Sequence, residues 1–259
     1  MESLNDILKK FARVELQGIN SNRLMNRVDV KFAFPVSKLG SFLKQLSADY
    51  ELLLVEGNFN LAYQTQYYDT PEFTMYMEHH NNALNRYKVR HRKYLHNNTG
   101  FLEVKFKNNK GRTLKERIIQ NQMQHAWTNL ENKFIAERTI YNPQTLVPKV
   151  LVNYTRLTLL NPALNEKVTI DLDLEFLSEI NNYKLNNLVI IEVKQATLTK
   201  TPVFSVLKDL NIKPLSISKY CLGVNYLYPL LKKNNFKQKL ITLSKIINDT
   251  PIAHIAGTR

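Results

Sequence analysis

The sequence is poor in cysteine, glycine and long apolar runs. It has 259 residues with one cysteine, seven glycines and nine prolines. The single thiol, Cys221, cannot form a disulfide within the chain or a zinc site built from several thiolates, so we expect a reducing compartment, the cytoplasm. No segment approaches the roughly 18 uninterrupted apolar residues of a membrane-spanning helix. The N-terminus has early acids and lacks the basic and apolar regions of a secretion signal.

Acidic residues are also scarce relative to basic ones. Lys and Arg number 36 and Asp and Glu number 22, which gives a net charge of +14. Such a charge attracts polyanions and disfavours basic partners. Hydrophobic residues make up 44% of the chain, which is too much apolar material for a disordered basic tail and indicates a folded core.

Common catalytic and phosphate-binding signatures are missing. The chain has no Gly-x-x-x-x-Gly-Lys-Thr sequence, so its phosphates would not be held by a P-loop. The six histidines show no ligand spacing beyond the adjacent pair His79-His80, which is more typical of a solvated helix end. Any reaction must therefore depend on residue types other than His and Cys.

Hydrophobic periodicity predicts an α+β fold in one domain, 1–259. Strands are expected at 27–32, 64–69, 86–94, 101–107, 113–119, 150–159, 167–176 and 188–196. Helices are expected at 2–13, 38–46, 128–137, 201–210, 220–231 and 236–247, with a short one capped by Thr70 that has Pro71 at its first position. We expect the core of the domain at 22–228, followed by a basic amphipathic tail at 229–259. We expect that tail to pack on the sheet, with docking on an anionic membrane or a partner as the alternative.

Charge is concentrated on one face of the predicted strands. Side chains alternate across a strand, so residues of one parity share a face. In most of these strands that parity collects Lys and Arg with a minority of acids, including Arg27, Asp29, Lys31, Arg86, Lys88, Arg90, Arg92, Glu103, Lys105, Lys107, Lys115, Arg117, Arg156, Lys167, Asp171, Glu192 and Lys194. One strand of this kind would be an ordinary solvated face. Several of them favour a sheet that closes with its charged faces inward and encloses phosphates.

Two readings of the acids on this face stay open. Carboxylates beside phosphate-binding cations are typical of a divalent metal bound through oxygen. Each acid could equally pair with a neighbouring Lys or Arg.

Short motifs on these strands resemble the VTC domain, the polyphosphate polymerase branch of the triphosphate tunnel metalloenzymes. They occur in the order Arg27-x-Asp29-x-Lys31-Phe32, Tyr68-Asp69-Thr70-Pro71, Lys88-x-Arg90-x-Arg92, Phe101-Leu102-Glu103-Val104-Lys105, Leu114-Lys115-Glu116-Arg117, Tyr154-x-Arg156, Ile170-Asp171-x-Asp173, Ile191-Glu192-Val193-Lys194 and Ser218-Lys219-Tyr220. The resemblance runs from about 27 to 223.

The resemblance implies a closed antiparallel β-barrel of roughly eight strands, with helices packed outside. It also implies an enzyme that transfers the γ-phosphate of ATP to a growing inorganic polyphosphate chain and releases ADP, with Mn or Mg as cofactor. The phosphate ligands would be Lys31, Arg90, Arg92, Lys105, Lys115, Arg156, Lys167 and Lys219. The catalytic residues would be Arg90, Arg92, Lys105, Lys115 and Glu192. Glu192 would hold the metal, with Glu103 and Asp171 as further candidates.

The sequence departs from the wider superfamily in one strand. Arg27-x-Asp29-x-Lys31 stands where the superfamily has Glu-x-Glu-x-Lys, which weakens a triphosphatase reading. The family also tends to place Arg at the position of Lys167, and Lys offers a point charge in place of a planar fork.

Alternatives from other functional classes are a non-catalytic binding module for polyphosphate, inositol phosphate or RNA, and a tunnel-fold triphosphatase. We expect no specific nucleic acid, because Tyr87, Tyr94 and Phe106, the aromatics that would stack on bases, are predicted to lie opposite the basic face. Related polymerases work beside a membrane subunit, so a membrane-associated partner is a further expectation.

Overall fold

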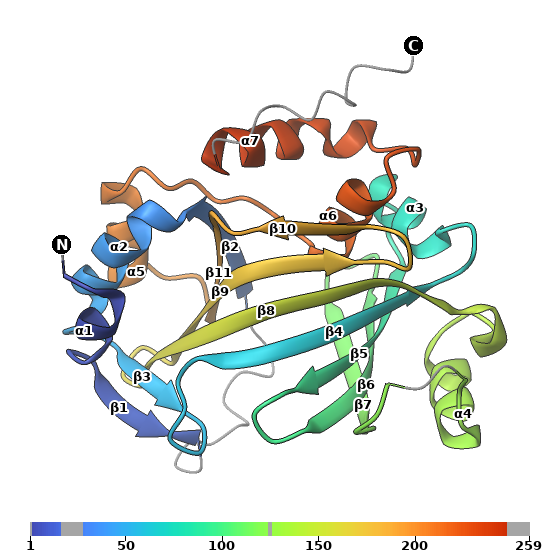
Figure 1. The fold of residues 1–259 in the computed structure, drawn as a ribbon, viewed down its shortest axis with the longest axis horizontal. Helices are drawn as coiled ribbons and strands as arrows, with labels where there is room; N and C mark the ends of the chain where they lie inside the picture. The colour runs from blue at the N-terminus through green and yellow to red at the C-terminus, as the bar shows by residue number, and fades with distance from the viewer. Residues whose placement is uncertain (1, 17–27, 124–125, 248–259) are drawn as a thin grey trace.

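The computed structural model describes residues 2–16, 28–123 and 126–247 (Figure 1). Its strands are β1 Ala12–Glu15, β2 Val28–Pro35, β3 Glu51–Leu54, β4 Leu61–Asp69, β5 Arg86–Tyr94, β6 Thr99–Lys107, β7 Thr113–Ile119, β8 Val147–Asn161, β9 Glu166–Leu177, β10 Asn182–Leu185 and β11 Leu188–Gln195. Its α-helices are α1 Leu4–Leu8, α2 Leu39–Leu46, α3 Thr74–His80, α4 Asn129–Arg138, α5 Pro202–Asp209, α6 Lys219–Leu227 and α7 Lys237–Ile247. Short 3-10 helices span Val36–Lys38, Pro143–Thr145 and Asn234–Phe236.

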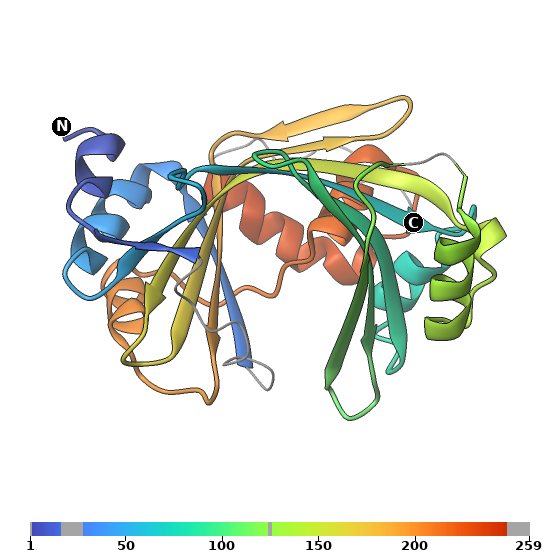
Figure 2. The same ribbon diagram turned by 90° about the horizontal axis from the view of Figure 1, so that it is seen from below.

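The strands form one strongly curled antiparallel sheet. The order of its main path is β2-β11-β9-β8-β4-β5-β6-β7. Seen from below, β5, β6 and β7 descend on one side and β2 and β11 on the other, with the long strands β4, β8 and β9 between them (Figure 2). We call the concave side of this sheet, which carries Lys31, Arg90 and Arg156, the inner face.

The sheet is open, which differs from the closed barrel that the sequence predicted. Within the described residues, its two edge strands β2 and β7 do not pair. The free edge of β2 is taken by a connecting segment, where Phe32 bridges to Pro214 and the Leu215 N–H donates to the Lys31 carbonyl at 2.8 Å. Part of the β2 edge is therefore paired with a segment that is not a strand of the sheet.

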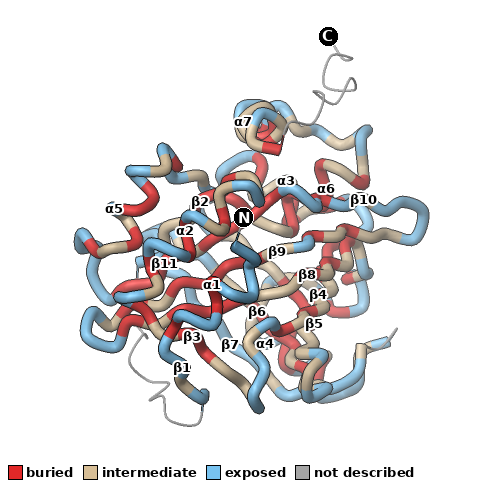
Figure 3. The backbone as a smooth tube through the Cα atoms, turned by 60° about the vertical axis from the view of Figure 1, so that its left-hand side comes forward, coloured by how far each residue is buried: buried red, intermediate tan, exposed pale blue. Residues whose placement is uncertain are grey.

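Three apolar clusters anchor the helices to the sheet. Helices α1, α2 and α5 cover the outer side of β2, β9 and β11, and α3 and α4 cover β5 and β6. The third cluster joins α6 and α7 to β4, β8 and β9. Buried residues follow these strands and the helix sides that face them (Figure 3).

Helix α6 packs on the inner face, although the sequence predicted helices only outside. Tyr220 of α6 stacks on Tyr67 of β4 with ring centroids 5.2 Å apart. The helix can approach because its Gly223 has no side chain: a Cβ there would lie 2.6 Å from Val150 Cγ1. The inner face is apolar at this end, where Val150 and Phe176 are fully buried, so α6 fills it.

The N-terminal region departs from the predicted helix at 2–13. Helix α1 ends at Leu8 and the chain continues as β1, which pairs in parallel with β3. Neither β1, β3 nor β10 was predicted, because four-residue strands carry too few alternations to give a signal.

The short helix after β4 begins later than predicted. Thr70 and Pro71 form a turn, and α3 starts at Thr74. Its first amides are held by the buried carboxylate of Asp69, which accepts from the N–H groups of Met75 and Tyr76, both at 2.9 Å. Thr70 contributes to the cap as predicted, because its Oγ1 accepts from the Thr74 N–H at 3.0 Å, and Asp69 adds the caps of the next two amides.

The remaining helices and strands agree with the predictions to within a few residues at each end. The C-terminal helix α7 buries Leu240, Leu243 and Ile247, which supports packing of the described part of the tail. The rest of the predicted tail, from 248 onward, lies outside the described residues. None of the helices in the part of the chain that the structure describes is long and apolar enough to cross a membrane.

Candidate phosphate-binding site

The most enclosed carboxylate of the inner face is Glu103 on β6, whose side chain is 0% exposed. Arg90, directly opposite on β5, donates from Nε to Glu103 Oε2 at 2.6 Å, and the Lys115 ammonium from β7 contacts the other oxygen. Burial alone would raise the pKa of Glu103, but Arg90, Arg92 and Lys115 outweigh it and hold the pKa below its ordinary value. Glu103 is therefore a charged link across the strands β5, β6 and β7.

A second buried carboxylate, Asp171 on β9, joins the sheet to α6. Arg156 on β8 grips it with two parallel bonds, Nε to Oδ1 at 2.5 Å and Nη2 to Oδ2 at 2.8 Å. The Lys219 ammonium, at the first residue of α6, contacts the same carboxylate. Burial favours the neutral acid, but the two cations keep the pKa of Asp171 below its usual range.

The third carboxylate, Glu192 on β11, is held more loosely. Lys194 contacts Oε2, whereas Lys31 on β2 lies 3.5 Å from Oε1. The side chain of Glu192 is 22% exposed, in contrast to Glu103. The attraction of Lys194 and Lys31 outweighs burial and lowers the pKa of Glu192 well below the ordinary value. Of these three acids, Glu192 has the oxygen most open to another ligand.

Several further cations of the inner face have no carboxylate partner among the described residues. Among them are Lys88 and Arg92 on β5 and Lys105 on β6. The neighbouring charge of Arg90, together with burial and Arg92, lowers the pKa of Lys105 well below its ordinary value. Burial lowers the pKa of Lys88, and Lys31 on the opposite side adds to the effect. Like charges held this close are most stable when an anion lies between them.

The two sides of the sheet face one another across the inner face. Lys31 of β2 donates to the Ile217 carbonyl at 3.0 Å, and Lys88 of β5 donates to Ser218 Oγ at 3.1 Å. One short segment, 217–218, therefore receives lysines from both sides. The charge of Lys105 on β6 also acts on the carboxylate of Glu192 on β11. The residues predicted from separate strands thus belong to one electrostatic site.

Lys167, the least certain of the predicted ligands, lies on the same strand face as Asp171 and pairs in register with Lys194. It is half-buried. Asp29 also pairs in register with Lys194. Arg27, the first residue of the β2 motif, lies outside the described residues.

Tyrosines complete the inner face; the sequence motifs included Tyr154 but missed Tyr63 and Tyr67. Tyr63 on β4 and Tyr154 on β8 stack with centroids 5.1 Å apart, and the Arg156 guanidinium lies over both rings. Tyr67 accepts from Arg90 Nη1 at 3.2 Å. The signal was present in the alternation of Tyr63, Thr65 and Tyr67 along β4.

The predicted position of one aromatic residue was wrong. Tyr94 has the same parity as Arg90 and Arg92, and it packs on Tyr63 with centroids 5.0 Å apart. Tyr87 and Phe106 do lie on the outer side, where they stack on each other at 4.6 Å.

The carboxylates do not form a metal cage. Within residues 2–16, 28–123 and 126–247, no group of three His, Cys, Asp or Glu side chains is close enough to hold an ion. Glu103 and Asp171 have both oxygens occupied by cations. Glu192 fits a divalent ion that takes one protein carboxylate and completes its shell with phosphate oxygens and water, a common arrangement for Mg in phosphoryl transfer.

Solved structures with some likeness to this chain come from several organisms. A candidate adenylyl cyclase from Hippeastrum with a dominant triphosphatase activity is 14% identical at a TM-score of 0.49, covering 80% of this chain and 99% of that one. A candidate adenylate cyclase from Bacillus halodurans is 12% identical at 0.44, over 75% and 96%. The protein PH1819 of Pyrococcus horikoshii OT3 is 11% identical at 0.44, over 77% and 99%.

No curated protein matches the sequence. A family comparison does match: residues 26–228 fit the VTC domain. This stretch contains the strands β2 to β11 and the helices α2 to α6 that build the inner face. Since the match covers most of the chain and all of the ion pairs described above, the chain belongs to the VTC domain family.

Proposed function

We propose that the protein is a polyphosphate polymerase that moves the γ-phosphate of ATP onto an inorganic polyphosphate chain. The observation that carries the proposal is that Lys88, Arg92 and Lys105 have no carboxylate partner among the described residues, on an inner face where Arg90, Lys115, Arg156 and Lys219 are already paired. A linear phosphate chain has regularly spaced negative charges, which would neutralise such a row of cations.

The proposed reaction needs no protein nucleophile. A terminal oxygen of the phosphate chain attacks the γ-phosphorus of ATP, a new P–O bond forms, and the bond between the γ-phosphorus and the β,γ-bridging oxygen breaks. The bridging oxygen leaves on ADP with its electron pair. Catalysis of such a transfer consists mainly of positioning and charge stabilisation. This agrees with the buried Cys221, whose pKa is raised by burial and which is therefore a poor nucleophile.

Each cation of the site has a role in this proposal. Arg92 offers a planar fork to the phosphate that is transferred, and Lys105 a point charge. Arg90, Lys115, Arg156 and Lys219 are already bound to Glu103 or Asp171. They would contribute their remaining donors and hold the strands in register. Lys31 and Lys167 would bind phosphates further along the chain.

A divalent ion, Mn or Mg, would be held by Glu192 together with substrate phosphate oxygens. When bound, such an ion neutralises charge that develops on the transferred phosphate. Glu103 and Asp171 have no role as metal ligands in this proposal, since each is enclosed by two cations. Of the three carboxylates bound to cations, Glu192 alone has an accessible oxygen, so affinity for the ion should depend on bound nucleotide.

A triphosphatase uses the same cations and differs in its acceptor, which is water. The experiment that separates the two is incubation of the full chain with ATP, Mn and a short polyphosphate primer. Long polyphosphate with stoichiometric ADP supports the proposal. Free phosphate with ADP supports the triphosphatase, and unchanged ATP with tight polyphosphate binding supports a binding module. Repeating the assay with added membranes tests the further proposal of a cytoplasmic enzyme that works beside a membrane partner.

A further inference from the structure

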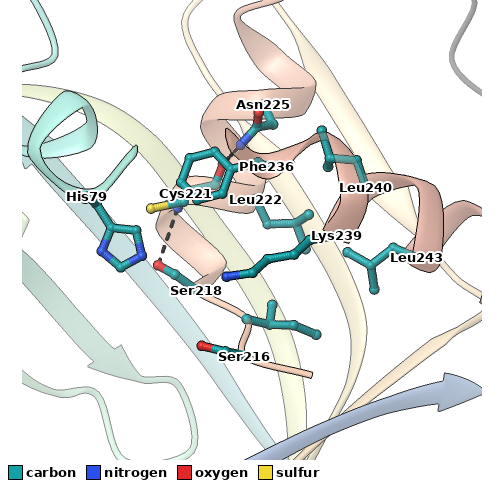
Figure 4. A pocket seen from close by; sticks show the side chains of 11 residues that line it. His79, Ser216, Ser218, Cys221, Leu222, Asn225, Phe236, Lys239, Leu240 and Leu243 are labelled. Atoms are coloured by element: carbon teal, nitrogen blue, oxygen red, sulfur yellow. Dashed lines mark hydrogen bonds between the residues drawn. The ribbon is translucent and has the colours of Figure 1, made fainter. Parts of the chain in front are cut away.

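A pocket lies between the segment 216–218, α3, α6 and α7 (Figure 4). It is a small half-open cavity of about 30 Å³. Four parts of the fold build it: α3 with His79, the segment 216–218, α6, and the C-terminal region with Lys239. None of the Lys, Arg or Glu residues assigned to the phosphate site lines it, although it shares Ile217 and Ser218 with the segment that receives Lys31 and Lys88.

The pocket has a polar end that is positively charged. Lys239 of α7 reaches across it toward Ser218 (Figure 4). Among the described residues that line the pocket there is no Asp or Glu, and Lys239 has no acidic partner in the described part of the chain. His79 lies at the same end, and its buried Nδ1 has no hydrogen-bond partner among the described residues.

Cations of the sheet add to the positive charge at this end of the pocket. Burial and the nearby cations Lys88, Arg86, Lys239 and Lys107 lower the pKa of His79 to about 2. The imidazole is therefore neutral at ordinary pH and keeps one N–H for donation. A pocket with an ammonium, a hydroxyl and an imidazole, and with further lysines close by, has the donors that recognise a phosphate group.

The pocket is also connected to the inner face. Ser218 lines the pocket and accepts from Lys88 of β5, and Ile217 lines it and accepts from Lys31 of β2. A phosphate in the pocket would thus lie next to Ile217 and Ser218, which accept hydrogen bonds from lysines on both sides of the cationic site. The apolar side chains of α6 and α7 form the opposite wall, which limits the space to a small anion or the end of a narrow chain.

We propose that this pocket beneath α7 binds a phosphate group. Two sources have the same chemistry: the end of a linear polyphosphate that extends beyond the inner face, or free orthophosphate that reports on the supply of phosphate. The first source rests on the function proposed above, whereas the second does not. In either case Lys239 is the residue that contacts the anion.

The test uses the full chain and measures the binding of orthophosphate, tripolyphosphate and long linear polyphosphate by calorimetry at constant ionic strength. The variant is Lys239→Met, which removes the charge and keeps the length of the side chain. The matched control is Lys237→Met, because Lys237 is an exposed lysine on the same helix that does not line the pocket. Melting temperatures of the three proteins verify that α7 stays packed.

If a chain end occupies the pocket, Lys239→Met should weaken long polyphosphate about tenfold, as expected for one charge-assisted contact, and leave tripolyphosphate unchanged. If orthophosphate occupies it, the wild type and Lys237→Met should bind orthophosphate and Lys239→Met should not, with long chains unaffected. Equal affinities of the three proteins for every ligand would overturn the proposal. A matching loss of tripolyphosphate binding would also overturn it, since Lys239 would then belong to the main site.

The outcome is independent of the synthesis assay. If the protein binds long chains through Lys239 but makes none from ATP, the polymerase proposal is refuted and the pocket proposal is supported. If it makes polyphosphate but Lys239→Met leaves all affinities unchanged, the polymerase proposal is supported and the pocket proposal is refuted.

Discussion

The two sides of the curled sheet differ in charge. The side formed by β5, β6 and β7 carries Lys88, Arg90, Arg92, Lys105 and Lys115 against one inner carboxylate, Glu103. The side formed by β2 and β11 has Lys31 and Lys194 next to Glu192, with Asp29 in register with Lys194. We call these the basic side and the balanced side.

This difference assigns different tasks to the two sides. The basic side cannot neutralise itself, so an anion has most to gain there. The balanced side has a carboxylate with an open oxygen, so a divalent ion can bind there between protein and phosphate. A phosphate chain lying between the two sides would be bound by cations on one side and by cation plus metal on the other.

The sharpest test compares the same substitution on the two sides. Glu192→Gln should abolish nearly all Mn-dependent synthesis while polyphosphate binding persists or tightens, because a negative charge is lost from the site. Glu103→Gln should instead destabilise the fold by about 3–5 kcal/mol, since it leaves Arg90 and Lys115 beside a buried neutral group. Synthesis, polyphosphate affinity and melting temperature are measured on the same preparations.

Two results would break the assignment. A Glu192→Gln protein that melts early but retains its activity per folded molecule would make Glu192 an ion-pair partner like Glu103. A Glu103→Gln protein that is stable but needs much more Mn would move the metal to the basic side.

The next test concerns the transferred phosphate on the basic side. Arg92→Ala should reduce turnover by about a hundredfold, the effect typical of losing one electrostatic contact in a transition state. Lys93→Ala is the matched control, because Lys93 follows Arg92 on β5 and points to the opposite face. Initial rates of ADP release at saturating ATP give the comparison. Equal losses in the two variants would mean that net charge, and not the inner face, determines activity.

Most residues of the inner face could be predicted from the sequence, but not which of its cations pair with which carboxylates. Alternation along β5 placed Arg90 and Arg92 together, and the order of the motifs led to the VTC domain. Which cations remain without a partner depends on register, since Glu103 lies opposite Arg90 and yet also binds Lys115. No local pattern in the sequence encodes that register across three strands.

The open sheet and the position of α6 on its inner face could not be predicted from the sequence either. Closure of the sheet depends on what pairs with β2, and that partner is the 214–215 segment, which is far away along the chain. The position of α6 depends on Gly223 fitting against Val150. A glycine within a helical pattern gives no indication of the surface it approaches.

A smaller effect is expected from pH, again on the basic side. Burial lowers the pKa of Lys115 to about 8 despite the attraction of Glu103. A bound polyanion favours the ammonium form, so binding takes up a proton above this pH. Polyphosphate affinity should then fall by up to about tenfold per pH unit as the pH rises above 8. Titrations across this range compare wild type with Lys115→Arg, which stays charged and should show a flatter profile.

The stability of the unliganded protein should change in the opposite sense. An unfolded lysine titrates near 10.4, so between about 8 and that value the unfolded chain binds more protons than the folded one. Stability without ligand should therefore rise with pH over this interval. A rise in affinity with pH, or the same profile in Lys115→Arg, would show that this lysine is not part of the site.

The smallest effect should come from the tyrosine between the two sides. Tyr67 stacks on Tyr220 and accepts from Arg90, and although burial would raise its pKa, the charges of Arg90, Arg92 and Lys219 outweigh it and lower the pKa. Its hydroxyl lies beside the guanidinium of Arg90 and can donate its proton to a phosphate oxygen. Tyr67→Phe keeps the ring stack and removes one hydrogen bond, so turnover should fall about three- to tenfold, with an unchanged melting temperature. Tyr87→Phe, a matched change on the outer side, should have no effect on rate. If both variants were silent, the basic side would act through its cations alone; if both were impaired, the distinction between inner and outer faces of β4 and β5 would fail.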